Sequence, residues 1–318
     1  MQKYYLEFEN PIKEIDLEIS QLESSRSVSP DILNKIGSLG KKRNEIINTI
    51  YSNLTRWQRV QLARHPERPF SLDYINLFSK DFIELHGDRL YGDDSAIITG
   101  IGTIGESRVI WIAQQKGRTT KENLFRNFGM MRPEGYRKAL RVMKLGEKFE
   151  LPIITLIDTI GAYPGIGAEE RGQGEAIARN LIEMASLKTN IISIIVGEGA
   201  SGGALGIGLC DKFYMLENTW YSVISPEGCA SILYRDAKKA GEAAESLMLA
   251  PNDLVSLGIC DKIITEPNGG AHRDILSTSQ KIQETIIKTL DQFKEENDKE
   301  YLENRIKKYD KMGFFKEV

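Results

Sequence analysis

The stretch that decides the fold is residues 191–209, IISIIVGEGASGGALGIGL. It opens with the run Ile191 to Val196, in which only Ser193 is polar, and this predicts a strand that is covered on both faces. Six glycines follow between 197 and 208 and predict a turn and then a short, glycine-rich helix from Ser201. A buried strand, a glycine turn and a helix in this order indicate an α/β layer structure.

The same alternation of short apolar runs and helices extends over about residues 70–270. The predicted strands are 96–104, 109–113, 153–157, 191–196, 213–216 and 262–265. The predicted helices are 72–85, 133–149, 169–187, a short one from 201, 226–236 and 243–249. Residues 11–54 predict a helical hairpin, because apolar residues recur at three- and four-residue intervals, and about 275–310 predicts a charged amphipathic helix.

The composition excludes several classes of protein. The chain has 318 residues and a formal net charge of −3, which argues against a protein that coats nucleic acid. Three scattered cysteines and three histidines disfavour both a disulfide framework and a metal site built by this chain alone, so no metal ligand is predicted. We recognise no signal peptide, transit peptide or membrane-spanning run, and we therefore expect a cytoplasmic protein, with the plastid stroma as an alternative.

Two catalytic motifs match residues 191–209. The pattern G-x-G-x-x-G from Gly197 is typical of dinucleotide binding, and Glu217 lies where a ribose-binding acid is expected. The pattern G-x-S-x-G around Ser201 is typical of a nucleophile elbow, for which His272 is the only downstream histidine. Each would make the chain an enzyme of a different class.

A third interpretation relies on the backbone. Gly202 and Gly203 at the start of a helix would leave N–H groups open to an oxyanion, with no side chain to block the approach. Glycine at these positions also permits close helix packing without any chemistry, and the residues alone leave both interpretations open.

Two further regions surround this stretch. A second glycine window follows the strand at 153–157, and it supplies a candidate pocket formed by Gly161, Tyr163, Pro164, Gly165, Gly167 and Arg171, with Ser201 from the first window. Residues 116–144 carry nine Lys or Arg side chains against two Glu. Lys116 and Arg118 in this region predict either an anion site, such as one for coenzyme A phosphates, or a contact with an acidic subunit.

Longer motifs carry a resemblance to a known family. They are ARHPERP (63–69), HGDR (86–89), QKGR (115–118), PEGYRKALR (133–141), GAYPG (161–165), GAEERGQ (167–173), EAIARN (175–180), GEGASGGAL (197–205), YSVISPEGCASIL (221–233) and GGAHR (269–273). Together they resemble the alpha subunits of bacterial-type acetyl-coenzyme A carboxylase carboxyltransferase over essentially the whole chain. The sequence departs from the family at Ile160, Gly174 and Ala200, where Pro, Ser and Gly are usual, but it keeps Gly202 and Gly203.

The resemblance implies a crotonase-like fold, a spiral of ββα units, for residues 66–272. It places a helical arm before it (1–65) and a helical extension after it (273–318). It implies transfer of a carboxyl group from carboxybiotin, borne by the biotin carboxyl carrier protein, to acetyl-coenzyme A, which gives malonyl-coenzyme A for fatty acid synthesis. Gly202 and Gly203 would stabilise the biotin enolate, and that anion would itself take the substrate proton, which would explain why histidine is scarce.

The resemblance also implies partners. The active site would be shared with a beta subunit of related fold in an α2β2 assembly. That subunit would hold the thioester oxygen and carry the only zinc. Biotin carboxylase would be the remaining component, and neither a membrane nor a nucleic acid is expected. A scaffold subunit with purely structural glycines is the non-enzymatic alternative.

Overall fold

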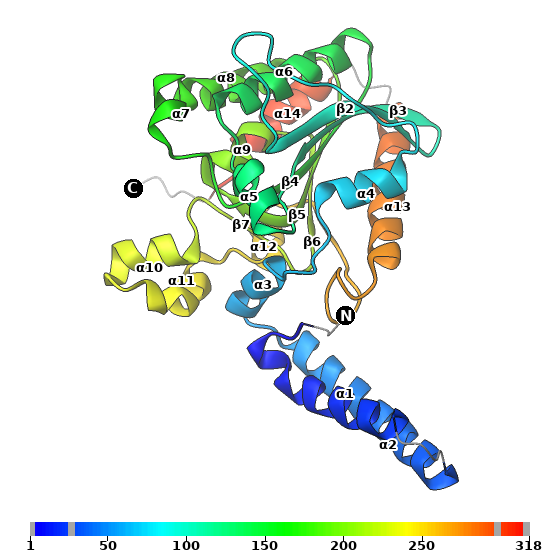
Figure 1. Ribbon diagram of the computed structural model, residues 1–318. Helices are drawn as coiled ribbons and strands as arrows, with labels where there is room; N and C mark the ends of the chain where they lie inside the picture. The colour runs from blue at the N-terminus through cyan, green and yellow to red at the C-terminus, as the bar shows by residue number, and fades with distance from the viewer. Residues whose placement is uncertain (1–3, 25–28, 296–299, 314–318) are drawn as a thin grey trace.

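The computed structural model describes residues 4–24, 29–295 and 300–313 and places one mixed β-sheet between two layers of helices (Figure 1). The strands are β1 (Ile83–Glu84), β2 (Ile97–Ile104), β3 (Ser107–Gln114), β4 (Ile153–Thr159), β5 (Ile191–Ala200), β6 (Lys212–Leu216), β7 (Trp220–Ser222) and β8 (Lys262–Ile264). Their order is β1-β2-β3-β4-β5-β6-β8, with β7 paired to the end of β5. Strands β3 to β6 and β8 are parallel, as predicted, whereas β1 and β2 are antiparallel.

Helices cover both faces of the sheet. They are α1 (Asn10–Glu23), α2 (Pro30–Ser52), α3 (Arg56–Ala63), α4 (Ser71–Phe78), α5 (Thr120–Phe125), α6 (Pro133–Lys148), α7 (Ile166–Glu170), α8 (Gln173–Ser186), α9 (Ser201–Gly208), α10 (Pro226–Tyr234), α11 (Ala240–Leu247), α12 (Pro251–Ser256), α13 (Ile275–Glu295) and α14 (Tyr301–Asp310). Among the described residues, no helix is both long and apolar enough to span a membrane. One sheet with helices on both faces confirms the predicted α/β fold class.

Strand β5 shows why the apolar run forms the centre of the sheet. Ile191 and Ile195 pack in one core cluster with residues of α6, α8 and α9, whereas Ile192 and Ile194 pack in a second cluster with residues of α4 and α13. Alternate side chains of a strand point to opposite faces, so a strand between two helical layers must be apolar at nearly every position.

The N-terminal hairpin α1–α2 extends away from the sheet, and α3 joins it to the body (Figure 1). Val60 and Ala63 of α3 pack with Ala200 and Trp220, which brings the start of the 64–70 segment to the end of β5. The division at residues 65 and 272 is a prediction that these contacts do not test. The single C-terminal helix expected over about 275–310 is instead two helices, α13 and α14, and residues 296–299 lie outside the described residues.

Two further predicted helices differ from the structure. The helix expected over 72–85 ends at Phe78, because Ile83 and Glu84 instead pair with Ile101 and Gly100 of β2. The helix expected over 169–187 is divided into α7 and α8 at Gly172, which has a left-handed φ of +81°. The chain turns at this glycine, and α8 then runs back over the sheet beside α6 (Figure 1).

Replacing Gly172 with alanine should lower the free energy of unfolding by about 1–2 kcal/mol, because an L-residue reaches the left-handed region only at that cost. Urea denaturation measures the change. Gly174→Ala is the matched control, since a Cβ there meets nothing within 4 Å and the residue lies within α8. It should be neutral or stabilising by up to about 1 kcal/mol. Equal losses in the two variants would contradict the assigned role of Gly172.

Candidate active site

The two glycine windows meet where β4 and β5 end. Thr159 of β4 pairs with Gly199 of β5, and the Gly161 backbone that follows β4 lies against the first turn of α9. The carboxyl ends of parallel strands are the usual place for a site in an α/β fold. The structure therefore brings the two windows together, and their use as a ligand pocket is still a prediction.

Helix α9 begins without a cap. Its N-cap residue is Ala200, which has no side-chain acceptor, whereas α2, α3, α5 and α10 each begin with a Ser or Thr that accepts a backbone N–H. The structure gives the amides of Gly202 and Gly203 no hydrogen-bond acceptor among the described residues. Unpaired N–H groups at the positive end of a helix form a ready site for an anion.

Gly203 is required by a close backbone contact. A Cβ on this residue would lie 2.3 Å from the carbonyl carbon and 2.5 Å from the carbonyl oxygen of Gly161. At Gly202 a Cβ would meet only the Ile177 side chain, at 3.4 Å. Close packing therefore explains Gly203 but leaves Gly202 without a packing requirement.

The loop after β4 is held by side chains that bind its backbone and pack on Tyr163. Thr159 Oγ1 donates to the Gly161 carbonyl at 2.7 Å and accepts from the Gly161 amide at 3.2 Å. Gln173 Nε2 donates to the carbonyl oxygens of Met131 and Tyr163, and the Arg132 guanidinium lies 4.7 Å from the centre of the Tyr163 ring. These contacts fix the loop beside the start of α9.

Arg171 is fixed beyond that loop. Its guanidinium donates to both carboxylate oxygens of Glu134, at 2.8 and 3.1 Å, and lies 4.4 Å from the centre of the Tyr91 ring. Pro164 is exposed, and Gly165 and Gly167 are half-buried beside it. A Cβ on Gly165 would lie 2.3 Å from the Tyr163 ring. The glycines thus allow the loop to fold tightly.

Ser201 has the backbone of a nucleophile elbow but lacks its partners. Its φ is +55°, in the left-handed region, and the residue is exposed. His272, however, stacks on His65 with 3.6 Å between ring centroids, and neither of its ring nitrogens has a hydrogen-bond partner within the described part of the chain. Burial lowers the pKa of the His272 imidazole to about 2. No acid orients this histidine, so the contacts do not support a hydrolase triad.

The dinucleotide pattern also fails in its geometry. A phosphate-binding G-x-G-x-x-G needs its first glycines in the turn after the strand. Here Gly197 and Gly199 lie within β5, and Gly199 pairs with Tyr221 of β7. Glu217 accepts a hydrogen bond from the backbone amide of Glu266 at 3.0 Å.

A buried ion network adjoins the site, and the sequence motifs did not reveal most of it. Lys116 Nζ lies 2.7 Å from an Asp158 carboxylate oxygen and 2.8 Å from one of Glu198. Arg64 reaches the other Glu198 oxygen at 2.6 Å. Burial opposes ionisation of Glu198, but the charges of Lys116 and Arg64 hold its pKa below the usual range. The only sequence signal for Lys116, Asp158 and Glu198 was that each follows a predicted strand.

Most cations of the basic region bind acceptors within this chain. Arg118 pairs with Asp73 at 2.5 Å and lies 4.9 Å from the centre of the Phe70 ring. Lys138 is buried and donates to the Ile97 carbonyl at 2.9 Å, and Arg141 donates to the Gly87 carbonyl at 2.9 Å. Side chains that are bound in this way have fewer free donors for an external anion.

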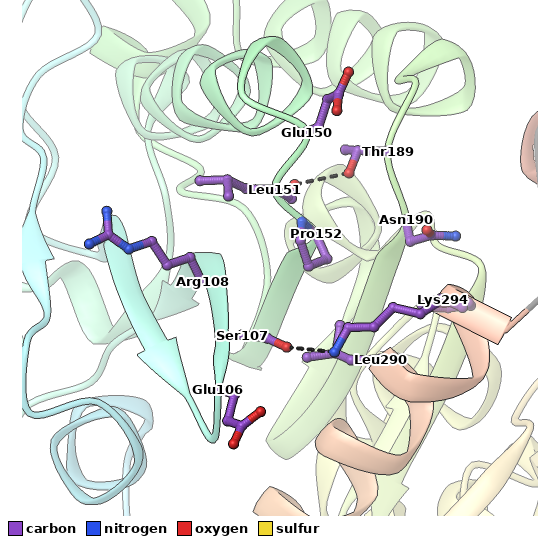
Figure 2. Close-up of a pocket in the computed structure, with 11 residues that line it drawn as sticks. Glu106, Ser107, Arg108, Glu150, Leu151, Pro152, Thr189, Asn190, Leu290 and Lys294 are labelled. Carbon is purple, nitrogen blue, oxygen red and sulfur yellow. Dashed lines mark hydrogen bonds between the residues drawn. The ribbon is translucent and has the colours of Figure 1, made fainter. Parts of the chain in front are cut away.

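Two pockets lie at opposite ends of the strands of the sheet. One, of about 280 Å³, is lined by Lys116, Arg118, Glu198 and Ile160 among others, at the edge where the glycine windows meet. The other, of about 390 Å³, is drawn in Figure 2 and lies where β4 and β5 begin, beside Pro152 and Asn190. The second pocket is lined by neither glycine window and belongs to no part of the candidate site.

Solved structures define the class of fold. The chain matches the transcarboxylase 12S core, solved with methylmalonyl-coenzyme A and methylmalonic acid bound, with a TM-score of 0.52 and 19% identity, over 65% of this chain and 40% of that one. It matches the beta subunit of P. aeruginosa geranyl-CoA carboxylase with a TM-score of 0.55 and 13% identity, over 75% of this chain and 44% of that one. The chain thus spans less than half of each. The fold is that of the crotonase-like carboxyltransferases, as the resemblance implied.

Sequence comparison defines the family. The acetyl co-enzyme A carboxylase carboxyltransferase-like family matches residues 5–313. The acetyl-coenzyme A carboxylase carboxyl transferase subunit alpha of Ruthia magnifica is 54% identical over 98% of this chain and 99% of its own length. The same subunit of Listeria monocytogenes is 51% identical over 98% of each. The chain belongs to this family, and it is a carboxyltransferase of the alpha-subunit type.

Proposed function

We propose that this chain transfers the carboxyl group of carboxybiotin, borne by a biotin carboxyl carrier protein, to acetyl-coenzyme A and so forms malonyl-coenzyme A for fatty acid synthesis. Relatives that are more than half identical and named as acetyl-coenzyme A carboxylase carboxyl transferase subunits support the substrate. The observation that carries the chemistry is the uncapped start of α9 beside the loop after β4.

The amides of Gly202 and Gly203 are the catalytic groups of this chain in our proposal. Bound carboxybiotin supplies the carboxyl group and a ureido oxygen on which negative charge develops as that group leaves. Two N–H donors that are already oriented at a helix start stabilise such charge without having to reorganise. One donor of this kind typically contributes about 100- to 1,000-fold in rate.

The neighbouring residues fit the rest of a biotin pocket. A Cβ on Gly161 would meet nothing within 4 Å, so this position leaves open space beside the helix start. Tyr163 and Arg171 are each fixed by a cation–π contact, and Arg171 also by its salt bridge. We assign Gly161, Tyr163, Pro164, Gly165, Gly167 and Arg171 to the wall of this pocket, with exposed Ser201 at its mouth.

The proposal requires a second chain. We infer that a beta subunit completes the site in an α2β2 assembly, binds the thioester oxygen and carries the zinc. The carrier protein and biotin carboxylase complete the enzyme. The buried, paired state of Lys116 favours a structural role for this residue, whereas half-exposed Arg118 is the better candidate for an interface.

A reconstitution assay tests this function. Carboxyl transfer from malonyl-coenzyme A to a free biotin analogue is measured for this chain alone, for a candidate beta subunit alone and for their mixture. We expect turnover only in the mixture, because each chain supplies one of two oxyanion sites. Turnover by this chain alone would contradict the shared site, and an inactive but assembled mixture would contradict the proposed reaction.

A further inference from the structure

Gln114 is the last residue of β3, and its fully buried amide joins β4 to the first turn of α9. Its Nε2 donates to the carbonyl oxygen of Gly203 at 2.7 Å. Its Oε1 accepts from the backbone amide of Asp158 at 3.2 Å. One partner is an acceptor and the other a donor, so only one orientation of the amide satisfies both.

This amide holds the first turn of α9 together with the close packing of Gly203 against the Gly161 carbonyl. Helix α9 has no capping side chain that would otherwise fix its first turn. Asp158 is itself tied to β5, because its carboxylate accepts from the backbone amide of Glu198 at 3.0 Å. The ends of β3, β4 and β5 therefore act as one support under Gly203.

The geometry points to Gln114 as a positioning residue that sets the orientation of the Gly202 and Gly203 amides. It touches no substrate and acts through the Gly203 carbonyl. The inference rests on the proposed role of these amides in stabilising charge. Misplacing a catalytic group by as little as 1 Å can cost about 100-fold in rate. If the side-chain amide of Gln114 lost its two hydrogen bonds, the first turn of α9 would be free to shift.

Gln115 provides a matched control. It is also a buried glutamine with two backbone partners, because its Oε1 accepts from the Leu72 amide and its Nε2 donates to the Lys116 carbonyl, both at 2.8 Å. One bond leads to Leu72 of α4, on the other face of the sheet from α9, and the other to the backbone of the next residue, Lys116; neither reaches α9. Gln114→Met and Gln115→Met therefore remove the same chemistry and differ in whether α9 loses its support.

The test compares both variants in the reconstituted complex. Gln114→Met should lower kcat for carboxyl transfer by about 10- to 100-fold and leave the KM for malonyl-coenzyme A within threefold. Gln115→Met should leave kcat within threefold of the unmodified complex, although both variants lose thermal stability. Equal losses of kcat in the two variants, or no loss in Gln114→Met, would overturn the inference.

Gln114→Glu keeps the shape and covers the case in which Gln114→Met does not fold. A carboxylate can still accept from the Asp158 amide but cannot donate to the Gly203 carbonyl, whereas a protonated carboxyl can do both. The nearby charges are those of Asp158, Glu198 and Lys116. Activity relative to the unmodified complex should therefore rise as the pH falls, and a ratio that is flat with pH would overturn the inference.

The outcome separates this inference from the proposed function. An inactive Gly203→Ala complex together with a fully active Gln114→Met complex would remove only the positioning role. A fully active Gly203→Ala complex would remove the catalytic role of the glycines and the inference with it.

Discussion

Replacing Gly203 with alanine should lower kcat for carboxyl transfer by about 100-fold or more. The added Cβ would lie 2.3 Å from the Gly161 carbonyl carbon, and the contact is with backbone, which cannot rotate away. The start of α9 must therefore move, and its amides move with it. The measurement is steady-state transfer from malonyl-coenzyme A to a biotin analogue in the reconstituted complex. The KM for malonyl-coenzyme A should change little, because the proposal assigns the thioester to the beta subunit.

Two further variants make this result interpretable. Gly174→Ala adds a Cβ to another glycine near a helix start, where it meets nothing within 4 Å, and should retain the activity of the unmodified complex. A Cβ at Gly202 would meet only the Ile177 side chain, so Gly202→Val should fold and assemble but lose transfer. Near-normal turnover in both Gly202→Val and Gly203→Ala would rule out the oxyanion role.

Replacing Lys116 with methionine should lower the free energy of unfolding by about 3–5 kcal/mol. The side chain is only 13% exposed and lies between two carboxylates, Asp158 and Glu198, that are 3–4% exposed. Removing the cation leaves Asp158 without its ammonium partner and leaves Glu198 with only Arg64. Chemical denaturation followed by circular dichroism measures the loss.

The stability loss of Lys116→Met should depend on pH. In the unmodified protein the pKa of Glu198 is lowered, so its contribution to stability is present above its unfolded pKa and is lost as the pH falls through the folded pKa. Without Lys116 the Glu198 carboxylate loses one of the two cations that lower its pKa, and it should take up a proton more readily. The deficit of the variant should therefore be largest near neutral pH and shrink in acid.

Lys144→Met is the control, because its pair with Glu183 is about half exposed on the lysine side and should cost at most about 1 kcal/mol. Equal losses at Lys116 and Lys144 would contradict a buried network.

The sequence was most informative where local pattern and tertiary structure agree. The run from Ile191 to Val196 is apolar because both faces of β5 are covered, and the glycines after it correctly predicted a short helix from Ser201. Prediction from the sequence failed where an element depends on contacts with residues far away along the chain. Ile83 lies in β1 only because it pairs with Ile101 of β2, and nothing local to residues 72–85 reveals that pairing. At Gly172 a signal was present, since glycine within a helical pattern often marks a break.

The candidate site divides in the same way. Gly202 and Gly203 could be proposed from sequence, because glycines at a predicted helix start are a local feature. Gln114, Asp158 and Glu198 could not, because each contributes through a contact more than 35 residues away along the chain. The basic run at 116–144 suggested an external anion, whereas Lys116 and Lys138 turn inward to bind carboxylates and carbonyls. A charge count does not reveal the direction in which side chains point.

The most direct test of the central claim is a structure of this chain with its beta subunit and a bound biotin analogue. The quantity to measure is the distance from the ureido oxygen of biotin to the amide nitrogens of Gly202 and Gly203. Our account predicts that this oxygen lies about 2.7–3.1 Å from at least one of the two nitrogens. A ureido oxygen bound elsewhere, with both amides directed at water or at another protein group, would contradict it.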